Sequence, residues 1–168
     1  MLSKKSFSRL SWLAFAAGCA FSTSHAASPV PQLTPATGGV LTEECTALLS
    51  KLGQLPQTHI TATELVKDGA LTVGGQPIAE HCRIVGKMHE RTSPVDGKPY
   101  AIGFEMRLPK NWNGRFLHQG NGGIDGVVQP ATGAFGGGPL TNALQQGFAV
   151  LSSDAGHTGA NPGFGVDP

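Results

Sequence analysis

A glycine-rich segment over residues 120–126, Gly-Asn-Gly-Gly-Ile-Asp-Gly, directly follows the stretch Phe116-Leu117-His118-Gln119. Glycines allow backbone conformations and close approaches that larger side chains prevent. A loop of this kind can direct several N–H groups at a developing negative charge, as in the oxyanion hole of an acyl-transfer enzyme. The residues therefore indicate an oxyanion-stabilising loop, and the local sequence leaves a simple glycine-rich surface turn open as the alternative.

A dinucleotide-binding site has similar ingredients, because it also joins a strand to a helix through closely spaced glycines. Its G-x-G-x-x-G spacing fails here, since Gly120 and Gly122 are present but residue 125 is an aspartate. No acidic residue ends a second strand about 20 positions later, where such a site would bind a ribose. The spacing disfavours a nicotinamide site, and we predict no cofactor for this segment.

A second polar segment follows the apolar run Phe148 to Ser152 and contains Ser153, Asp154 and His157. These are the residue types of a catalytic triad. Triad members normally come from separate loops, however, and the nucleophile requires a strained elbow between a strand and a helix. We therefore expect Asp154 to cap the turn. His157 is expected to pack or hydrogen-bond near the site, where it is a candidate for contact with a substrate.

Motifs of several enzyme classes are absent from this sequence. It contains no G-x-S-x-G, the nucleophile elbow of many serine esterases, and neither H-E-x-x-H nor C-x-x-C. The histidines are scattered without the spacing of metal ligands, so we predict no metal site. They are His25, His59, His81, His89, His118 and His157.

The N-terminus has the features of an export signal. A basic stretch over residues 4–9 precedes an apolar run from Leu10 to Phe21, and Ser24-His25-Ala26 has small residues at both ends of a cleavage triplet. The apolar run is too short to span a bilayer. We predict a signal peptide over residues 1–26 and a secreted or periplasmic protein. Lipid attachment through Cys19 is the alternative.

The composition indicates about one domain, since 39% of the 168 residues are apolar and 14% are charged. A formal net charge of +1 provides no basic stripe for phosphates, so a small neutral substrate is a better expectation than nucleic acid. Signal cleavage would remove Cys19 and leave Cys45 and Cys82 in a compartment where disulfides persist. We predict that these two cysteines form a disulfide; two buried free thiols are the alternative.

The N-terminal part of the mature chain divides into a leader and a helix. Residues 27–41 are rich in Ser, Pro, Thr and Gly and predict a flexible leader, so we place the domain at 42–168. Thr42 can cap a helix that ends near Gly53. Its apolar stripe, at i, i+3, i+4 and i+7, consists of Cys45, Leu48, Leu49 and Leu52.

The rest of the chain is expected to form strands. His81 to His89 and the alternating segment Tyr100 to Leu108 predict an antiparallel pair joined by the turn Asp96-Gly97, whereas 58–67 fits either a strand or a helix. The helix would be tied to the first of these strands through the two cysteines. After Pro109 the pattern indicates a β-loop-α-β unit. Its parts are a strand at Arg115 to His118, the glycine segment, a helix at about 140–146 and a strand at Phe148 to Ser152.

Several segments together resemble the tannase and feruloyl esterase family. They are Cys45 with Glu80-His81-Cys82, the strand Tyr100 to Leu108, the run Leu108-Pro109-x-x-Trp112-Asn113-Gly114-Arg115-Phe116, the glycine segment 120–126, and Ser152 to His157. The resemblance covers about Thr42 to Pro168, and Trp-Asn-Gly-Arg-Phe with the following glycines is its most specific part. It implies an α/β fold, here an incomplete α/β-hydrolase sheet with an N-terminal helix and antiparallel strands. A helix-to-strand disulfide like Cys45–Cys82 is also typical of the family.

The resemblance implies a serine hydrolase that acts on esters of aromatic acids such as gallate or ferulate. Gly123 then matches the residue that supplies an oxyanion-hole amide, and Gly120, Asn121 and Gly122 are candidates for the substrate loop. The family's nucleophile, in a Gly-Cys-Ser-x-Gly elbow, its Asp and His, and its calcium-bearing lid all lie C-terminal to the position that matches Pro168. We therefore expect an N-terminal fragment that is inactive alone. A non-catalytic exported module that binds a small aromatic or anionic ligand is the alternative.

Overall fold

The structure is a computed structural model that describes residues 34–134 and 142–159. All of these except Thr34 belong to one compact unit, which begins at Pro35. The predicted signal peptide with Cys19 lies outside the described residues, as do residues 27–33 of the expected leader.

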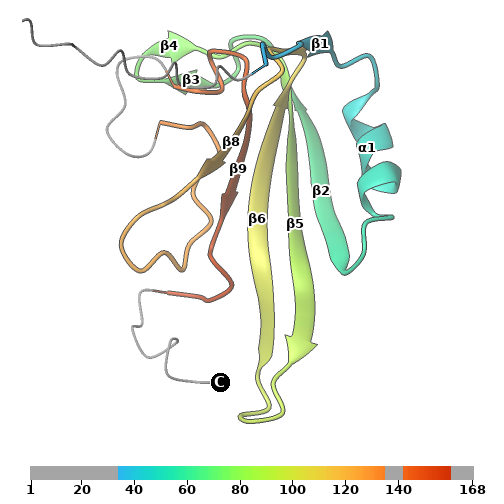
Figure 1. Cartoon of the computed structure of the whole chain (residues 1–168), viewed down its shortest axis with the longest axis vertical. Helices are drawn as coiled ribbons and strands as arrows, with labels where there is room; N and C mark the ends of the chain where they lie inside the picture. The colour runs from blue at the N-terminus through green and yellow to red at the C-terminus, as the bar shows by residue number, and fades with distance from the viewer. Residues whose placement is uncertain (1–33, 135–141, 160–168) are drawn as a thin grey trace, which may run out of the picture. The chain divides into compact units, whose positions relative to one another are not determined.

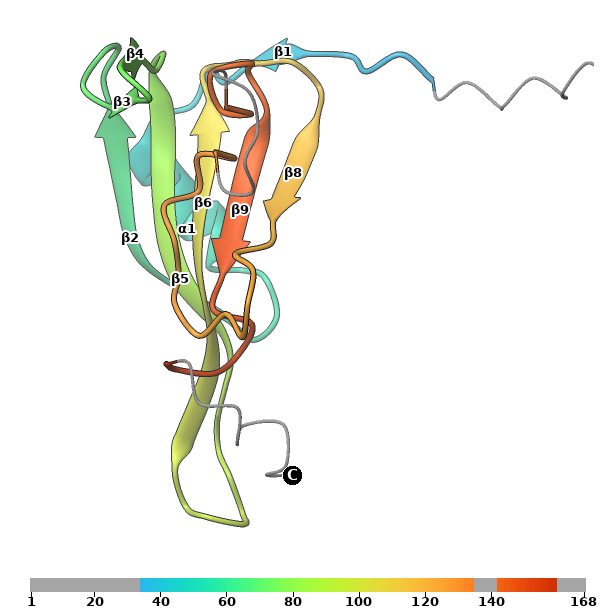
Figure 2. The same cartoon turned by 90° about the vertical axis from the view of Figure 1, so that its left-hand side faces the viewer.

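A mixed five-stranded sheet forms the centre of this unit, with the strand order β2-β5-β6-β9-β8 (Figures 1 and 2). Neighbouring strands are antiparallel from β2 to β9, whereas β8 and β9 are parallel. Together with a helix packed on the sheet, this arrangement agrees with the predicted α/β class. The strands are β2 (Thr58–Val66), β5 (His81–Thr92), β6 (Pro99–Pro109), β8 (Phe116–Gln119) and β9 (Ala149–Ser153).

Two short strand pairs lie outside the sheet. One joins β3 (Thr72–Val73) to β4 (Gln76–Pro77), and the other joins β1 (Gly39–Val40) to β7 (Asn111–Trp112). The strand β1 falls in the stretch for which we predicted a flexible leader, so this part of that prediction is wrong. A Cβ atom on Gly38 would lie 2.5 Å from the carbonyl oxygen of Trp112. The glycines that look like leader composition therefore permit close backbone pairing here.

The antiparallel hairpin of β5 and β6 confirms the prediction for these two strands. Their register runs from His81 opposite Pro109 to Thr92 opposite Pro99. The predicted turn is present: Gly97 has a φ of +71°, and the Ser93 N–H donates to the Lys98 carbonyl at 2.9 Å. The segment left open by the sequence is a strand, β2, which pairs with β5.

The helix α1 (Cys45–Leu52) begins later than its predicted cap. Glu44, not Thr42, occupies the N-cap position, and no side chain caps the helix there. The predicted end is confirmed, because the Gly53 N–H donates to the Leu49 carbonyl at 3.0 Å. Of the predicted stripe, Cys45 and Leu48 are buried and Leu52 packs against the core, while Leu49 is 46% exposed. A helix of eight residues thus contacts the sheet along a narrow stripe.

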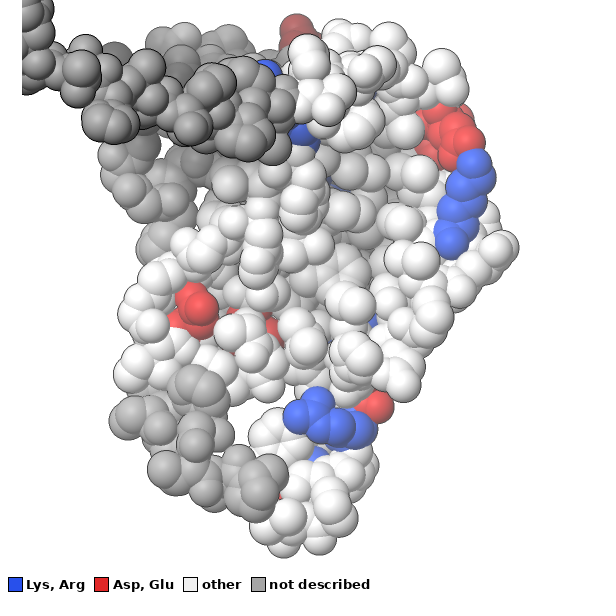
Figure 3. Space-filling view, in the orientation of Figure 1, with Lys and Arg blue, Asp and Glu red and all other residues white. Residues whose placement is uncertain are grey.

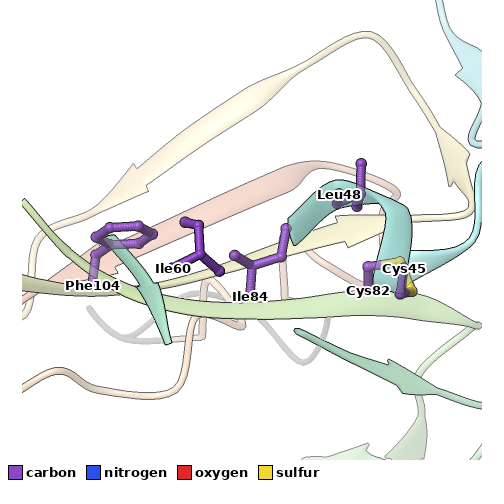
Figure 4. Packing of buried hydrophobic residues seen from close by; sticks show 6 residues of the cluster. All are labelled: Cys45, Leu48, Ile60, Cys82, Ile84 and Phe104. Carbon is purple, nitrogen blue, oxygen red and sulfur yellow. A yellow bond between two sulfur atoms is a disulfide. The ribbon is translucent and has the colours of Figure 1, made fainter. Parts of the chain in front are cut away.

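One apolar cluster lies between α1 and one face of the sheet (Figure 4), and a second, made of Ile78, Ala131, Leu144 and Val150, includes a residue of β9 and residues of the β8–β9 connection. The first cluster contains a disulfide between Cys45 of α1 and Cys82 of β5, which confirms the predicted pairing. The Cα atoms of the two cysteines are 5.5 Å apart, a normal separation for a disulfide. The other buried members of this cluster are Leu48, Ile60, Ile84 and Phe104.

The parallel pairing of β8 with β9 agrees with the predicted β-loop-α-β unit, but the described part of the connection contains no helix. Of the segment predicted to be helical, residues 140 and 141 lie outside the described residues, and Asn142 to Gln146 form turns. The Asn142 Oδ1 accepts the Gln145 N–H at 2.9 Å, and Gly147 has a φ of +84°. An asparagine that caps a turn and a left-handed glycine five residues later leave room for about one turn only.

Removal of the disulfide should lower the free energy of unfolding by roughly 3 to 4 kcal/mol, because the bridge closes a loop between cysteines 37 positions apart. The double variant Cys45→Ala/Cys82→Ala tests this by urea unfolding of the 168-residue chain. A reducing agent should destabilise the wild type by a similar amount and leave the double variant unchanged. A wild-type midpoint that does not respond to reduction would contradict the prediction.

Candidate functional site

The predicted oxyanion loop lies at the carboxyl ends of the two parallel strands. The segment 120–126, called the glycine loop from here on, begins where β8 ends at Gln119, and the turn with Asp154 begins where β9 ends at Ser153. The Gly126 N–H donates to the Asp154 carbonyl at 3.2 Å, which holds the two segments together. In open α/β sheets ligands bind at this edge, so the loop is in the expected place for a site.

The glycine loop exposes backbone amides. Gly122 and Gly123 have φ values of +78° and +62°, both residues are exposed, and neither N–H donates to an acceptor within residues 34–134 and 142–159. A Cβ atom on Gly123 would meet nothing within 4 Å, so the space beside it is open. Two adjacent amides are therefore available to an anionic group. Gly120 is also exposed.

Asn121 occupies a different place from the other loop residues. Its side chain is buried, with 6% of the residue exposed. The Nδ2 group donates to the Ser153 carbonyl at 2.8 Å and to the Ser152 Oγ at 3.0 Å, and the Gln119 Nε2 donates to the Oδ1 at 2.9 Å. Asn121 was predicted as a member of the substrate loop, and within that loop its side-chain amide is bound inside the protein.

His157 and Asp154 lie against the last residue of the glycine loop, Gly126. Asp154 caps its turn as predicted: its Oδ1 accepts the Gly156 N–H at 2.9 Å and also the Gly103 N–H of β6 at 3.0 Å. His157 is buried, its Nδ1 lies 3.1 Å from the Gly159 carbonyl oxygen, and a Cβ atom on Gly126 would lie 2.9 Å from its ring. His157 thus packs as expected, and its burial disfavours direct contact with a substrate.

A hollow of about 570 Å³ opens beside Asp154. It lies between the turn that follows β9 and the far half of the β5–β6 hairpin. Asp154 connects the hollow to the glycine loop only through its backbone bond to Gly126, because no residue of 120–126 lines the hollow. Its described lining includes Gly103, Asp154, Thr158, Lys87, Arg91 and Tyr100.

A family model described as tannase and feruloyl esterase matches residues 82–168, more than half of the chain. The chain belongs to this family. The match contains the glycine loop, both parallel strands and the turn with Asp154. The resemblance read from the sequence is therefore confirmed.

Similar proteins include some that are named feruloyl esterase and one that is named mono(2-hydroxyethyl) terephthalate hydrolase. The mono(2-hydroxyethyl) terephthalate hydrolase of Piscinibacter sakaiensis is 41% identical over 106 residues, which are 58% of this chain and 17% of the relative. The probable feruloyl esterase B of Aspergillus clavatus is 30% identical over 129 residues, 70% of this chain and 22% of the relative. The crystal structure of feruloyl esterase B from Aspergillus oryzae is similar, with a TM-score of 0.50 and 28% identity over 70% of this chain and 22% of that chain. The chain spans about a fifth of the length of these proteins.

In this member of the tannase and feruloyl esterase family, a buried ionic cluster lies on the sheet face opposite α1. Glu105 of β6 is at its centre, with 8% of its side chain exposed. Its Oε2 accepts the Arg83 Nε at 2.8 Å, and its Oε1 accepts the Arg107 Nε at 2.8 Å and the Ala131 N–H at 3.0 Å. The sequence showed Glu105 and Arg107 only as the polar side of an alternating strand. It carried no signal for Ala131, whose N–H binds Glu105 from 26 positions away.

The pKa values in this cluster follow from its geometry. Burial acts to raise the pKa of Glu105, but the Ala131 N–H and the two guanidinium groups outweigh it and hold that pKa below the ordinary value. Burial lowers the pKa of His81, and nearby Arg107 acts in the same direction. The Arg107 Nη1 lies 2.8 Å from the His81 Nε2, and the Ala79 carbonyl lies 2.8 Å from the Nδ1. A neutral His81 that donates from Nδ1 satisfies both contacts.

The visible surface carries scattered charges (Figure 3). The charged side chains on this face lie in a few small groups with wide uncharged areas between the groups. Within the described residues, no group of three or more His, Cys, Asp or Glu side chains is placed to hold a metal ion. No helix in that part has the length and hydropathy needed to cross a membrane.

Glu105→Gln should lower the free energy of unfolding at neutral pH by about 3 kcal/mol, because it leaves two guanidinium groups without their buried counter-charge. The pKa of Glu105 is lower in the folded chain, so its stabilising contribution is present above the ordinary glutamate pKa of about 4.3 and is lost as the pH falls through the folded value. The gap between variant and wild type should therefore shrink below about pH 4.3.

Urea unfolding between about pH 3 and about pH 7 measures this gap. The range begins about one unit below the ordinary glutamate pKa and ends at neutrality. Glu80→Gln is the matched control, because Glu80 pairs with Lys110 at the surface and its loss should change stability little. A pH-independent gap, or an equal effect of the two substitutions, would show that Glu105 has no special role.

Proposed function

We propose that this chain forms the oxyanion-loop part of an exported serine carboxylic ester hydrolase that acts on esters of aromatic acids, such as ferulate, gallate or related aryl esters. One observation carries the proposal: in a member of the tannase and feruloyl esterase family, the Gly122 and Gly123 amides are exposed and unbound where the parallel strands end. The names of the relatives, which specify feruloyl and terephthalate esters, support an aromatic acid as the acyl group. Export is supported by the signal-like sequence and by the disulfide.

The sheet is proposed to be part of a larger α/β-hydrolase sheet. The described part of β8 pairs with β9 on one side only, and Phe116 on it is 58% exposed. Parallel strands normally lie in sheets that are covered on both faces. Further strands and helices of a longer polypeptide would cover this edge and face.

The proposed chemistry is acyl transfer through a covalent intermediate. A histidine-activated serine attacks the ester carbonyl, the alcohol leaves, and water hydrolyses the acyl-enzyme. The Gly123 N–H would donate to the oxyanion in both tetrahedral intermediates, and the second donor would follow the nucleophile. The serine, aspartate and histidine are assigned to residues that this sequence does not contain, since it lacks a G-x-S-x-G elbow. One oxyanion donor contributes roughly 3 to 4 kcal/mol, which cannot replace the covalent route.

The same amides support a second candidate function without chemistry. The chain as it stands could be an exported module that binds a small aromatic or anionic ligand at Gly122 and Gly123. The observation that favours this alternative is again the missing nucleophile elbow.

The first test is ester hydrolysis by the chain and by a chimera. Residues 42–168 replace the matching segment of the Piscinibacter sakaiensis hydrolase, and both proteins are offered methyl ferulate and mono(2-hydroxyethyl) terephthalate. We expect no turnover by the 168-residue chain, and turnover by the chimera that a serine-directed inhibitor abolishes. The control is the chimera with its elbow serine replaced by alanine. Turnover by the chain alone would refute the assignment, and an inactive, folded chimera combined with saturable ferulate binding by the chain would favour the binding module.

The second test removes the Gly123 N–H alone. Replacement of Gly123 by glycolic acid, which turns the amide into an ester, should lower kcat of the chimera by about 10²- to 10³-fold. Gly75 is the matched control, because it is an exposed glycine with a similar φ of +77° in the β3–β4 turn. Gly123→Ala retains the N–H and its Cβ meets no atoms within 4 Å, but the φ of +62° strains an alanine, so a loss of activity in that variant does not isolate the N–H as the ester replacement does. Unchanged kinetics with the ester at position 123 would eliminate this amide as a donor.

A further inference from the structure

The glycine loop is anchored at both ends by one buried side chain, that of Asn121. The Nδ2 group donates to the Ser153 carbonyl at 2.8 Å and to the Ser152 Oγ at 3.0 Å, both at the end of β9. It also lies 3.3 Å from the Val127 carbonyl, directly after the loop. A single amide group therefore joins the entry of the loop, its exit and the neighbouring strand.

The acceptor side of the same amide binds the strand before the loop. The Gln119 Nε2 donates to the Asn121 Oδ1 at 2.9 Å, and the Ser152 Oγ lies 3.2 Å from that oxygen. Gln119 in turn accepts the Gly133 N–H at 2.8 Å through its Oε1. Asn121 thus uses donor and acceptor at once, and neither aspartate nor leucine, its near-isosteres, can do so.

The loop between these anchors has a backbone that needs external support. Gly122, Gly123, Asp125 and Gly126 all have positive φ values, and glycines lose more conformational freedom on ordering than any other residue. Inside the loop, one backbone hydrogen bond links the Asp125 N–H to the Gly122 carbonyl at 3.2 Å. The direction of the exposed amides is therefore set largely by the bonds that Asn121 and Gly126 make to neighbouring segments.

We propose that Asn121 is a positioning residue that orients the Gly122 and Gly123 amides towards the reacting carbonyl. This inference rests on the proposed function, because it gives those amides their role as oxyanion donors. Oxyanion donors act through being fixed before charge develops, so a loosened loop binds the transition state less well while it still admits the substrate. Loss of the Nδ2 donor should consequently appear in kcat and not in KM.

The kinetic test uses Asn121→Asp in the chimera with methyl ferulate. The substitution retains the size of the side chain and the Oδ1 acceptor but replaces the Nδ2 donor by a second carboxylate oxygen, which faces the Ser153 and Val127 carbonyl oxygens and repels them. We expect kcat to fall by about 10²-fold, the effect of a small misplacement of a catalytic group, with KM unchanged. The matched control is Asn113→Asp at the other end of β8, where the Nδ2 donates to the Gln146 carbonyl at 2.8 Å. That variant loses a comparable hydrogen bond away from the loop and should retain the wild-type kcat.

A second measurement does not depend on activity. Hydrogen exchange of the 168-residue chain should be faster in peptides covering residues 120–128 for Asn121→Asp than for wild type, and unchanged in β5 and β6. If Asn121→Asp fails to fold, Ser152→Ala removes one partner only and should produce the same kinetic pattern with a smaller loss.

The outcomes separate the two proposals. An inactive wild-type chimera would overturn the proposed function, and hydrogen exchange would still test whether Asn121 holds the loop. An active chimera in which Asn121→Asp retains wild-type kcat would overturn the positioning role, as would an equal loss of kcat in Asn113→Asp. A lower kcat with unchanged KM, together with faster exchange confined to the loop, would support it.

Discussion

The Ala131 N–H donates to the buried carboxylate of Glu105, and this bond holds the long connection between β8 and β9 against the sheet. The described residues 120–134 of that connection contain no helix or strand, so their buried backbone groups need partners from elsewhere. Glu105 can serve as one because Arg83 and Arg107 balance its charge. Without these guanidinium groups the carboxylate would be too costly to bury, and the connection would lose a fixed point on the sheet.

The two faces of the sheet therefore hold different parts of the chain, the helix α1 on one face and the connection between β8 and β9 on the other. On one face, α1 and the Cys45–Cys82 disulfide enclose an apolar cluster, which secures the helix to β5. On the other, a second apolar cluster that includes Ala131 and Val150 lies beside polar side chains of β6 and β8, which bond to irregular backbone. Apolar packing is non-directional, whereas hydrogen bonds to a carboxylate or an amide specify where a particular N–H lies. A loop that must present amides in a set direction is accordingly held by hydrogen bonds to polar side chains.

Local sequence patterns predicted the elements that depend on interactions between residues close in the sequence. The helix with its end at Gly53 and the hairpin turn at Gly97 follow from spacing within short windows, whereas the cysteine pair follows from the two cysteines that signal cleavage would leave in an oxidising compartment. The glycine loop was found for the same reason, because its glycines are adjacent. The expectation of a leader at Gly39–Val40 differs from the structure because it too used nearby residues only. The composition there resembles a leader until the partner strand β7, more than 70 positions away, is known.

The supporting residues could not be found in this way, because each acts over a long sequence separation. Asn121 bonds to residues 31 and 32 positions away, and Glu105 bonds to one 26 positions away. In the sequence, Asn121 is one more polar residue among glycines, and it was grouped with them as a candidate for the substrate loop. Its burial distinguishes it from the exposed glycines of that loop. A flexible glycine backbone can offer its amides, but a side chain with both a donor and an acceptor, excluded from water, is what can hold them in one direction.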